Sequence, residues 1–166
     1  IFEMAMKEDF PGWGNMLEKG NGTFFEDWEC RGSALHSSYL YIGSWFIEAL
    51  GGIRRTESGY KQFIIEPWIT EKGPQQVRSH YNSMYGNIES NWAVNSGVLN
   101  LEVTVPANTT AILKLSDIDL ETLKEGDSIW KEAKGVSLYT QKGKAISLAL
   151  QSGTYRFSVT MNSGLQ

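Results

Sequence analysis

Residues 23–29 combine three carboxylates with three aromatic rings and directly follow a Gly-Asn-Gly turn. Burying an unpaired carboxylate is costly, so this segment does not suit a hydrophobic core. A solvated surface does not suit it either, because two Phe and one Trp gain nothing from exposure. A concave site with aromatic walls and reactive carboxylates requires this mixture of residues. We therefore take Glu26 as the candidate catalytic group and expect Asp27 and Glu29 to cap or solvate a turn.

The composition limits the class of protein and its partners. The 166 residues suffice for one domain or parts of two. The net charge of −4 and the scattered Lys and Arg argue against a nucleic acid or an acidic membrane surface as partner. No apolar run approaches the roughly 18 residues of a membrane span. The aromatic content of 12 %, with six Trp, is high, as in sugar-binding proteins and in large cores.

The sequence contains no motif for a cofactor or a metal. Cys30 is the only cysteine, which excludes an internal disulfide and a thiolate metal cluster, and no paired base activates it. Phosphate-binding Gly-rich loops, Walker motifs and zinc-ligand spacings are absent. The chain begins at Ile1 without an initiator Met or a signal peptide, which suggests a fragment or a processed piece. A periplasmic or secreted location is slightly favoured over a cytoplasmic one.

The first part of the chain has a helical pattern. Residues 1–10 predict the end of a helix that Pro11 and Gly12 stop, and residues 16–19 predict a helical turn or a strand. A longer helix is expected from Ser33, as N-cap, to Gly51-Gly52. Gly43 inside it costs about 1 kcal/mol relative to Ala, which the close approach of a neighbouring helix would explain. The apolar stripe of this helix comprises Leu35, Tyr39, Ile42, Phe46, Ala49 and Leu50, with Trp45 beside it as a core residue.

Beyond residue 59 the hydrophobic period becomes two, which is typical of half-buried strands. The expected strands are 62–66, 77–83, 86–94, 98–105, 110–115, 128–131, 136–140, 145–150 and 153–159. Short strands at this spacing predict an antiparallel β-sandwich of about 100 residues. We place the domain boundary near Glu57-Ser58-Gly59, which gives domains at 1–58 and 59–166. The aromatic and His side chains expected to pack in the sandwich are His80, Tyr81, Tyr85 and Trp92.

The segments PGWGNMLE at residues 11–18 and GNGTFFEDW at residues 20–28, with others that follow them in order, resemble bacterial α-L-rhamnosidases of glycoside hydrolase family 78. Residues 11–18 (PGWGNMLE), 20–28 (GNGTFFEDW), 33–36 (SALH) and 43–46 (GSWF) resemble the last helices of the catalytic domain in that family. Residues 59–67, 85–92 and 103–111 resemble the landmarks of its C-terminal β-sandwich. The resemblance extends to about residue 116 and is thin between 117 and 144. It implies the C-terminal helices of a six-hairpin α/α toroid, followed by an antiparallel β-sandwich.

The resemblance also implies a role for individual residues. Glu26 matches the family's general base in its Thr-x-Trp-Glu-x-Trp motif, and Phe25 stands where that motif has its first Trp. His36 matches the His of an Asn-His pair whose Asn is Leu35 here. The resemblance thus implies an inverting glycosidase that cleaves terminal α-L-rhamnosides, with its general acid far upstream of this chain. Inversion needs two carboxyl groups about 6.5–9.5 Å apart.

The other site residues expected to contact substrate are aromatic: Phe25 as an aromatic wall, and Trp28 and Trp13 as faces on which a sugar ring stacks. His36 would donate a hydrogen bond to sugar hydroxyls or to Glu26. The expected partners are a rhamnosyl glycoside and the remainder of the catalytic domain. The chain alone is expected to be inactive, and the apolar faces left without their partner helices are expected to cause self-association.

Two alternatives remain open. In one, the β-sandwich is a carbohydrate-binding module and the helical part is only a stub. In the other, the β-sandwich is purely structural.

Overall fold

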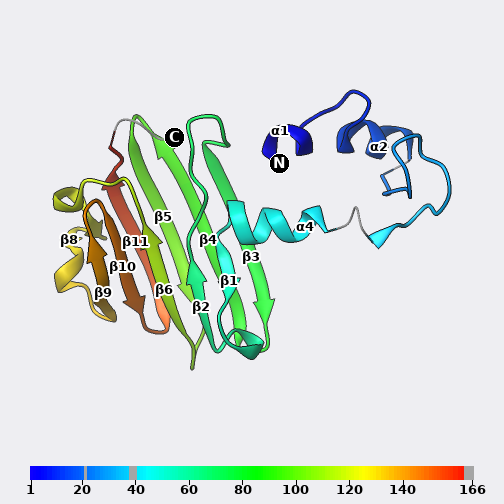
Figure 1. The fold of residues 1–166 in the computed structure, drawn as a ribbon. Helices are drawn as coiled ribbons and strands as arrows, with labels where there is room; N and C mark the ends of the chain where they lie inside the picture. The colour runs from blue at the N-terminus through cyan, green and yellow to red at the C-terminus, as the bar shows by residue number, and fades with distance from the viewer. Residues whose placement is uncertain (21, 38–40, 163–166) are drawn as a thin grey trace. The chain divides into compact units, whose positions relative to one another are not determined.

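The computed structural model describes residues 1–20, 22–37 and 41–162 (Figure 1). It divides into two compact units, Ile1–Phe46 and Ile47–Gln166. The expected boundary near residues 57–59 lies C-terminal to this division. The reason is that β1 (Ile53–Arg55) already pairs with β2 (Gln62–Ile65) in the sheet of the second unit. The protein is mostly β-structure with short helices. Among the described residues no helix is long and apolar enough to cross a membrane.

The first unit contains α1 (Phe2–Ala5), α2 (Trp13–Lys19) and α4 (Ile42–Trp45). The helix expected over 1–10 is therefore a single turn, whereas the helical turn expected at 16–19 is confirmed as part of α2. The described residues of this unit do not form a toroid. Asn21 of the Gly-Asn-Gly turn lies outside the described residues.

The long helix expected from Ser33 is wrong over its first part. Leu35 lies in a bend with 67 % of its surface exposed, and Tyr39 lies outside the described residues. Ser33 is not a helix cap, because its backbone N–H donates to a side chain of the preceding loop. A Cβ at Gly43 would meet no described residue within 4 Å, so no helix in the described part of the chain explains this glycine. The predicted end is confirmed: α4 continues as a π-helical turn, Phe46–Leu50, which stops at Gly51-Gly52.

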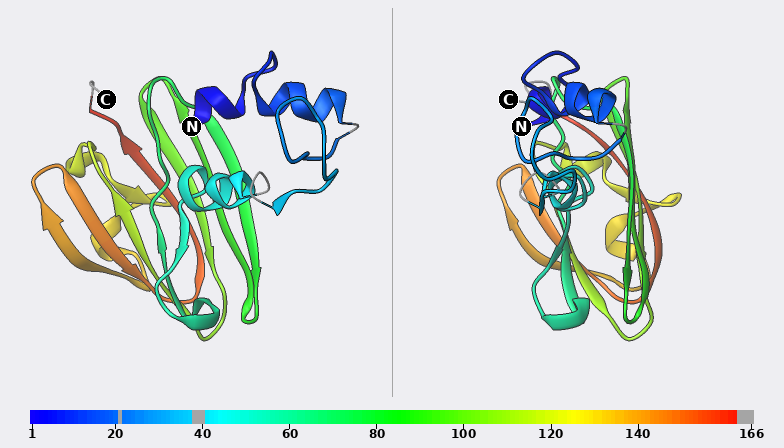
Figure 2. Two further views of the ribbon diagram at one scale, coloured as in Figure 1. Left: turned by 45° about the vertical axis from the view of Figure 1, so that its right-hand side comes forward. Right: turned by 90° about the vertical axis from the view of Figure 1, so that its right-hand side faces the viewer.

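The second unit is a sandwich of two sheets that face each other (Figure 2). One sheet has the order β1-β2-β6-β10-β9, with β6 at Thr110–Leu115, β9 at Val136–Lys142 and β10 at Ala145–Leu150. The other has the order β3-β4-β5-β11-β7-β8, with β3 at Gln76–Ser83, β4 at Gly86–Asn95, β5 at Val98–Val105, β7 at Lys124–Glu125, β8 at Ser128–Ile129 and β11 at Gly153–Thr160. The β-sandwich that the sequence predicts is confirmed.

The prediction of a purely antiparallel sandwich is wrong for one pair of neighbouring strands, because β2 and β6 run parallel. The chain leaves the first sheet after β2, forms β3 to β5 in the second sheet, and re-enters beside β2 in the same direction. The strand expected at 128–131 is limited to β8, since the chain turns at Trp130 into a short 3-10 helix, Trp130–Glu132.

The core lies between the two sheets and follows the period of two. In β5 the buried residues are Leu99, Leu101, Val103 and Val105, as their alternation predicts, and Asn100, Glu102 and Thr104 face outward. Of the aromatic residues assigned to packing, Trp92 is buried and its indole N–H donates to the Leu50 carbonyl at 2.8 Å. Tyr81 and Tyr85 are half-buried. The assignment of His80 is wrong, because its position on β3 points it to the exposed face.

Candidate functional site

Backbone hydrogen bonds fold residues 24–36 into a loop that presents Glu26. The His36 N–H donates to the Phe24 carbonyl at 3.0 Å, and the Glu26 N–H donates to the Ser33 carbonyl at 3.0 Å. The Thr23 hydroxyl donates to the Ala34 carbonyl at 2.5 Å. Two antiparallel stretches of chain are thereby held side by side without forming a regular strand. The arrangement fixes the backbone on both sides of Glu26.

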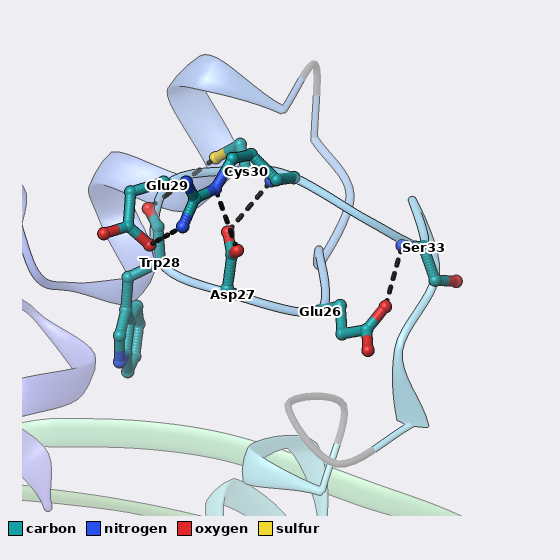
Figure 3. A network of polar contacts seen from close by, with 7 residues as sticks. Glu26, Asp27, Trp28, Glu29, Cys30 and Ser33 are labelled. Atoms are coloured by element: carbon teal, nitrogen blue, oxygen red, sulfur yellow. Dashed lines mark hydrogen bonds and ion pairs between the residues drawn. The ribbon is translucent and has the colours of Figure 1, made fainter.

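The Glu26 carboxylate is exposed and is held in one orientation by the returning chain (Figure 3). The backbone N–H of Ser33 donates to Oε2 of Glu26 at 3.2 Å. This is the hydrogen bond that orients the Glu26 side chain within the described residues. Gly32, at φ 72°, makes the close approach possible, because a Cβ there would lie 2.5 Å from Oε2. An exposed carboxylate with a free oxygen can accept a proton from water.

Asp27 and Glu29 form a separate cluster on the other side of the loop, around Arg31. Asp27 accepts from the Arg31 N–H at 2.9 Å and from its Nε at 3.1 Å, while Arg31 Nη2 lies 3.3 Å from Glu29 Oε2. The expectation that Asp27 caps a turn is therefore confirmed. The backbone N–H of Arg31 lowers the pKa of Asp27, and the side-chain hydrogen bond and charge of Arg31 lower it further. Glu26 does not take part in this cluster (Figure 3).

The lowered pKa of Asp27 gives a pH prediction for the loop. A carboxyl whose pKa is lower in the folded state than in the unfolded state contributes stability. This stability is fully present above the unfolded-state pKa and is lost as the pH falls through the folded-state pKa. We expect the Asp27 carboxyl to titrate in NMR below its ordinary value of 3.8. Arg31→Ala should return this pKa only part of the way toward the ordinary value, because the variant loses the side-chain contacts and keeps the backbone N–H that lowers the pKa most, whereas Lys19→Ala should leave the pKa unchanged. An unshifted Asp27 pKa in the unmodified chain would contradict the contact.

The aromatic residues expected to contact substrate pack within their own unit. Trp13 and Trp28 meet edge to face with ring centroids 5.3 Å apart. Phe25 packs over Gly20, where a Cβ would lie 2.6 Å from its ring. The structure thus brings Trp13 and Trp28 together, and all three rings are half-buried. His36 is also half-buried, and its backbone joins the loop two residues from Glu26.

Three further residues shape this site: Arg31 and Gly32, which the sequence does not single out, and Ser33, which it indicates only as a helix N-cap and as part of a family segment. In the sequence, Gly32 between Arg31 and Ser33 is the only signal for the turn at which the chain reverses its direction. Among the described residues no group of three or more His, Cys, Asp or Glu is arranged to hold a metal ion.

Comparison with known proteins places the chain in a family. Residues 52–129 match the bacterial alpha-L-rhamnosidase C-terminal domain. An alpha-L-rhamnosidase of Formosa agariphila is 29 % identical over 168 residues, which cover 95 % of this chain and 18 % of that protein. The chain corresponds to the C-terminal part of a bacterial α-L-rhamnosidase.

Solved α-L-rhamnosidases have the same fold over this region. The enzyme from Dictyoglumus thermophilum aligns with a TM-score of 0.78 and 26 % identity, over 96 % of this chain and 18 % of its own. The enzyme from Streptomyces avermitilis, solved with L-rhamnose, aligns with a TM-score of 0.79 and 23 % identity, over 96 % of this chain and 16 % of its own. The chain therefore spans less than a fifth of the length of these relatives.

Proposed function

We propose that this chain is part of an inverting glycoside hydrolase that removes terminal α-L-rhamnosyl groups, and that Glu26 is its general base. The observation that carries the proposal is the exposed Glu26 carboxylate, which accepts from the Ser33 N–H. The resemblance matches this residue to the general base of the family. The proposed substrate is supported by the relatives, which are α-L-rhamnosidases. One of them, from Streptomyces avermitilis, was solved with L-rhamnose.

In the proposed reaction Glu26 takes a proton from a water molecule as the water oxygen attacks the anomeric carbon. The bond from that carbon to the leaving oxygen breaks, and a general acid from the upstream part of the protein protonates the leaving oxygen. The sugar is released with the opposite anomeric configuration. Phe25, Trp28 and Trp13 supply aromatic surface near the sugar, and His36 donates to a sugar hydroxyl or to Glu26. No step requires a cofactor or a metal.

The upstream part of the protein is the proposed partner of the first unit. The residues of this unit carry large apolar side chains that are more than a third exposed: Ile1, Met4, Met6, Phe10, Leu17, Leu35, Tyr41 and Phe46. Such a number of exposed large apolar side chains in a unit this small is expected where another part of the protein covers them. We propose that this first unit, Ile1–Phe46, completes the catalytic toroid implied by the resemblance, most of which lies upstream. The sandwich takes no part in the chemistry.

These proposals predict the behaviour of the isolated 166-residue chain. We expect no release of nitrophenol from an aryl α-L-rhamnoside, because the acid is missing. We also expect self-association through the exposed apolar residues, visible in sedimentation velocity at high concentration.

Met4→Ser with Leu35→Ser should reduce this association, whereas Leu138→Ser, an equally exposed change on β9, should not. Turnover by the pure chain, or a monomer at every concentration, would contradict the corresponding proposal.

A further inference from the structure

A groove of about 550 Å³ lies on the second unit, on the face of the six-stranded sheet turned away from the core. It crosses β3, β4, β5 and β11, and the β7–β8 turn at Gly126-Asp127 borders it. These strands run side by side in Figure 1. The volume lies within the roughly 300–1,000 Å³ of small-molecule sites. Every lining residue belongs to the second unit, so the groove is independent of the Glu26 loop.

The strand register arranges the polar groups of this groove in rows. Arg78 on β3 is paired with Asn91 on β4, Asn91 with Glu102 on β5, and Glu102 with Arg156 on β11. A guanidinium, an amide, a carboxylate and a second guanidinium therefore form one line across four strands. The neighbouring row contains Gln76, Ala93, Asn100 and Ser158. Such a grid offers donors and acceptors at the spacing of adjacent strands, about 4.8 Å.

The charges of the groove balance one another. Arg156 Nε lies 2.7 Å from Glu102 Oε2, which neutralises that pair. Arg78 forms no ion pair with any described residue, and Asp127 supplies a second carboxylate on the opposite border. Two guanidinium groups and two carboxylates give no net charge. A polyanion therefore gains little here, whereas a neutral ligand rich in hydroxyl groups can form hydrogen bonds with the polar side chains of both rows.

The floor of the groove determines how such a ligand is held. Trp92, Leu101 and Phe157 border it but are at most 3 % exposed, because their side chains point into the core. Recognition therefore depends on hydrogen bonds rather than on stacking. We propose that this groove binds a neutral oligosaccharide, which lies across the strands and contacts Arg78, Asn91 and Asn100. An open groove without an aromatic platform implies a Kd in the millimolar range, about −4 kcal/mol.

The test is a ¹H–¹⁵N NMR titration of the 166-residue chain with L-rhamnotriose and xylotriose, and with trigalacturonate as the charged counterpart. We expect at least one neutral trisaccharide to shift the amides of β3, β4, β5 and β11. Arg78→Ala and Asn100→Ala should each weaken its binding at least fivefold. Both side chains are exposed, so the fold should be retained.

The matched control is His80→Ala, which changes an exposed residue of the same strand that does not line the groove. The affinity of His80→Ala for the neutral trisaccharide should equal that of the unmodified chain. Glu26→Gln should also leave the binding unchanged, which separates this groove from the proposed catalytic role. The proposal is overturned if neither neutral trisaccharide shifts these amides at tens of millimolar, if trigalacturonate binds more tightly, or if Arg78→Ala binds as the unmodified chain does.

Discussion

In the full-length enzyme, Glu26→Gln is expected to lower kcat about 10²- to 10⁴-fold, the usual contribution of a positioned acid or base. This factor corresponds to about 3–5 kcal/mol in the activation barrier. The amide has nearly the size of the carboxylate but cannot accept a proton from water. Because the loop is held mainly by backbone hydrogen bonds, KM should change little. The measurement is steady-state kinetics on an aryl α-L-rhamnoside.

Glu29→Gln is the matched control, because it removes a second carboxylate from the same exposed loop. Glu29 is paired with Arg31, and an exposed ion pair of this kind contributes at most about 1 kcal/mol. Its kcat should therefore remain close to that of the unmodified enzyme. Equal losses in the two variants would show that the loop needs its charges only for structure.

Leu148→Ala is expected to lower the free energy of unfolding by about 2–5 kcal/mol, the cost of a cavity in a packed core. Leu148 lies on β10 with none of its surface exposed, at the centre of the sandwich. Its register partner across the strand pair is Leu138 on β9, which is 52 % exposed. Leu138→Ala makes the same chemical change and should cost no more than about 0.5 kcal/mol.

Urea denaturation followed by circular dichroism measures the stability of both variants. For Leu148→Ala the urea concentration at the midpoint should fall, while the slope of the unfolding free energy against urea concentration stays unchanged. Similar midpoints for the two variants would contradict the placement of the core between the sheets.

The sandwich could be predicted from the sequence because most of its long strands, although not β9, alternate between buried and more exposed side chains. Leu99 to Val105 shows this best, since every second side chain is buried. The short strands β1 and β7 were not predicted, because two or three residues are too few to show a hydrophobic period. The parallel pairing of β2 with β6 is a contact between distant segments, which no local pattern records.

The helical prediction from Ser33 failed for a related reason. Apolar residues at helical spacing indicate a helix only if a core covers them, and Leu35 is exposed. In this chain the segment instead returns along the loop, where Ser33 and Ala34 bond to Glu26 and Thr23. Tertiary hydrogen bonds therefore decide its conformation rather than propensity.

The candidate site was only partly predictable. The density of carboxylates and rings indicated Glu26, and the resemblance to a known motif assigned its role. The orienting contact with Ser33 spans seven residues through Gly32 at positive φ. Neither the contact nor the pairing of Trp13 with Trp28 has a signature in the sequence, because both depend on how the loop closes.

Deprotonation of the attacking water by Glu26 can be tested most directly by azide rescue of Glu26→Ala in the full-length enzyme. Azide is already an anion and needs no base, and the smaller side chain leaves room for it. With an activated aryl α-L-rhamnoside, we predict that azide restores release of the phenol and that the product is β-L-rhamnosyl azide, identified by ¹H NMR. No rescue, or an azide product that retains the α configuration, would contradict the role of Glu26 as general base.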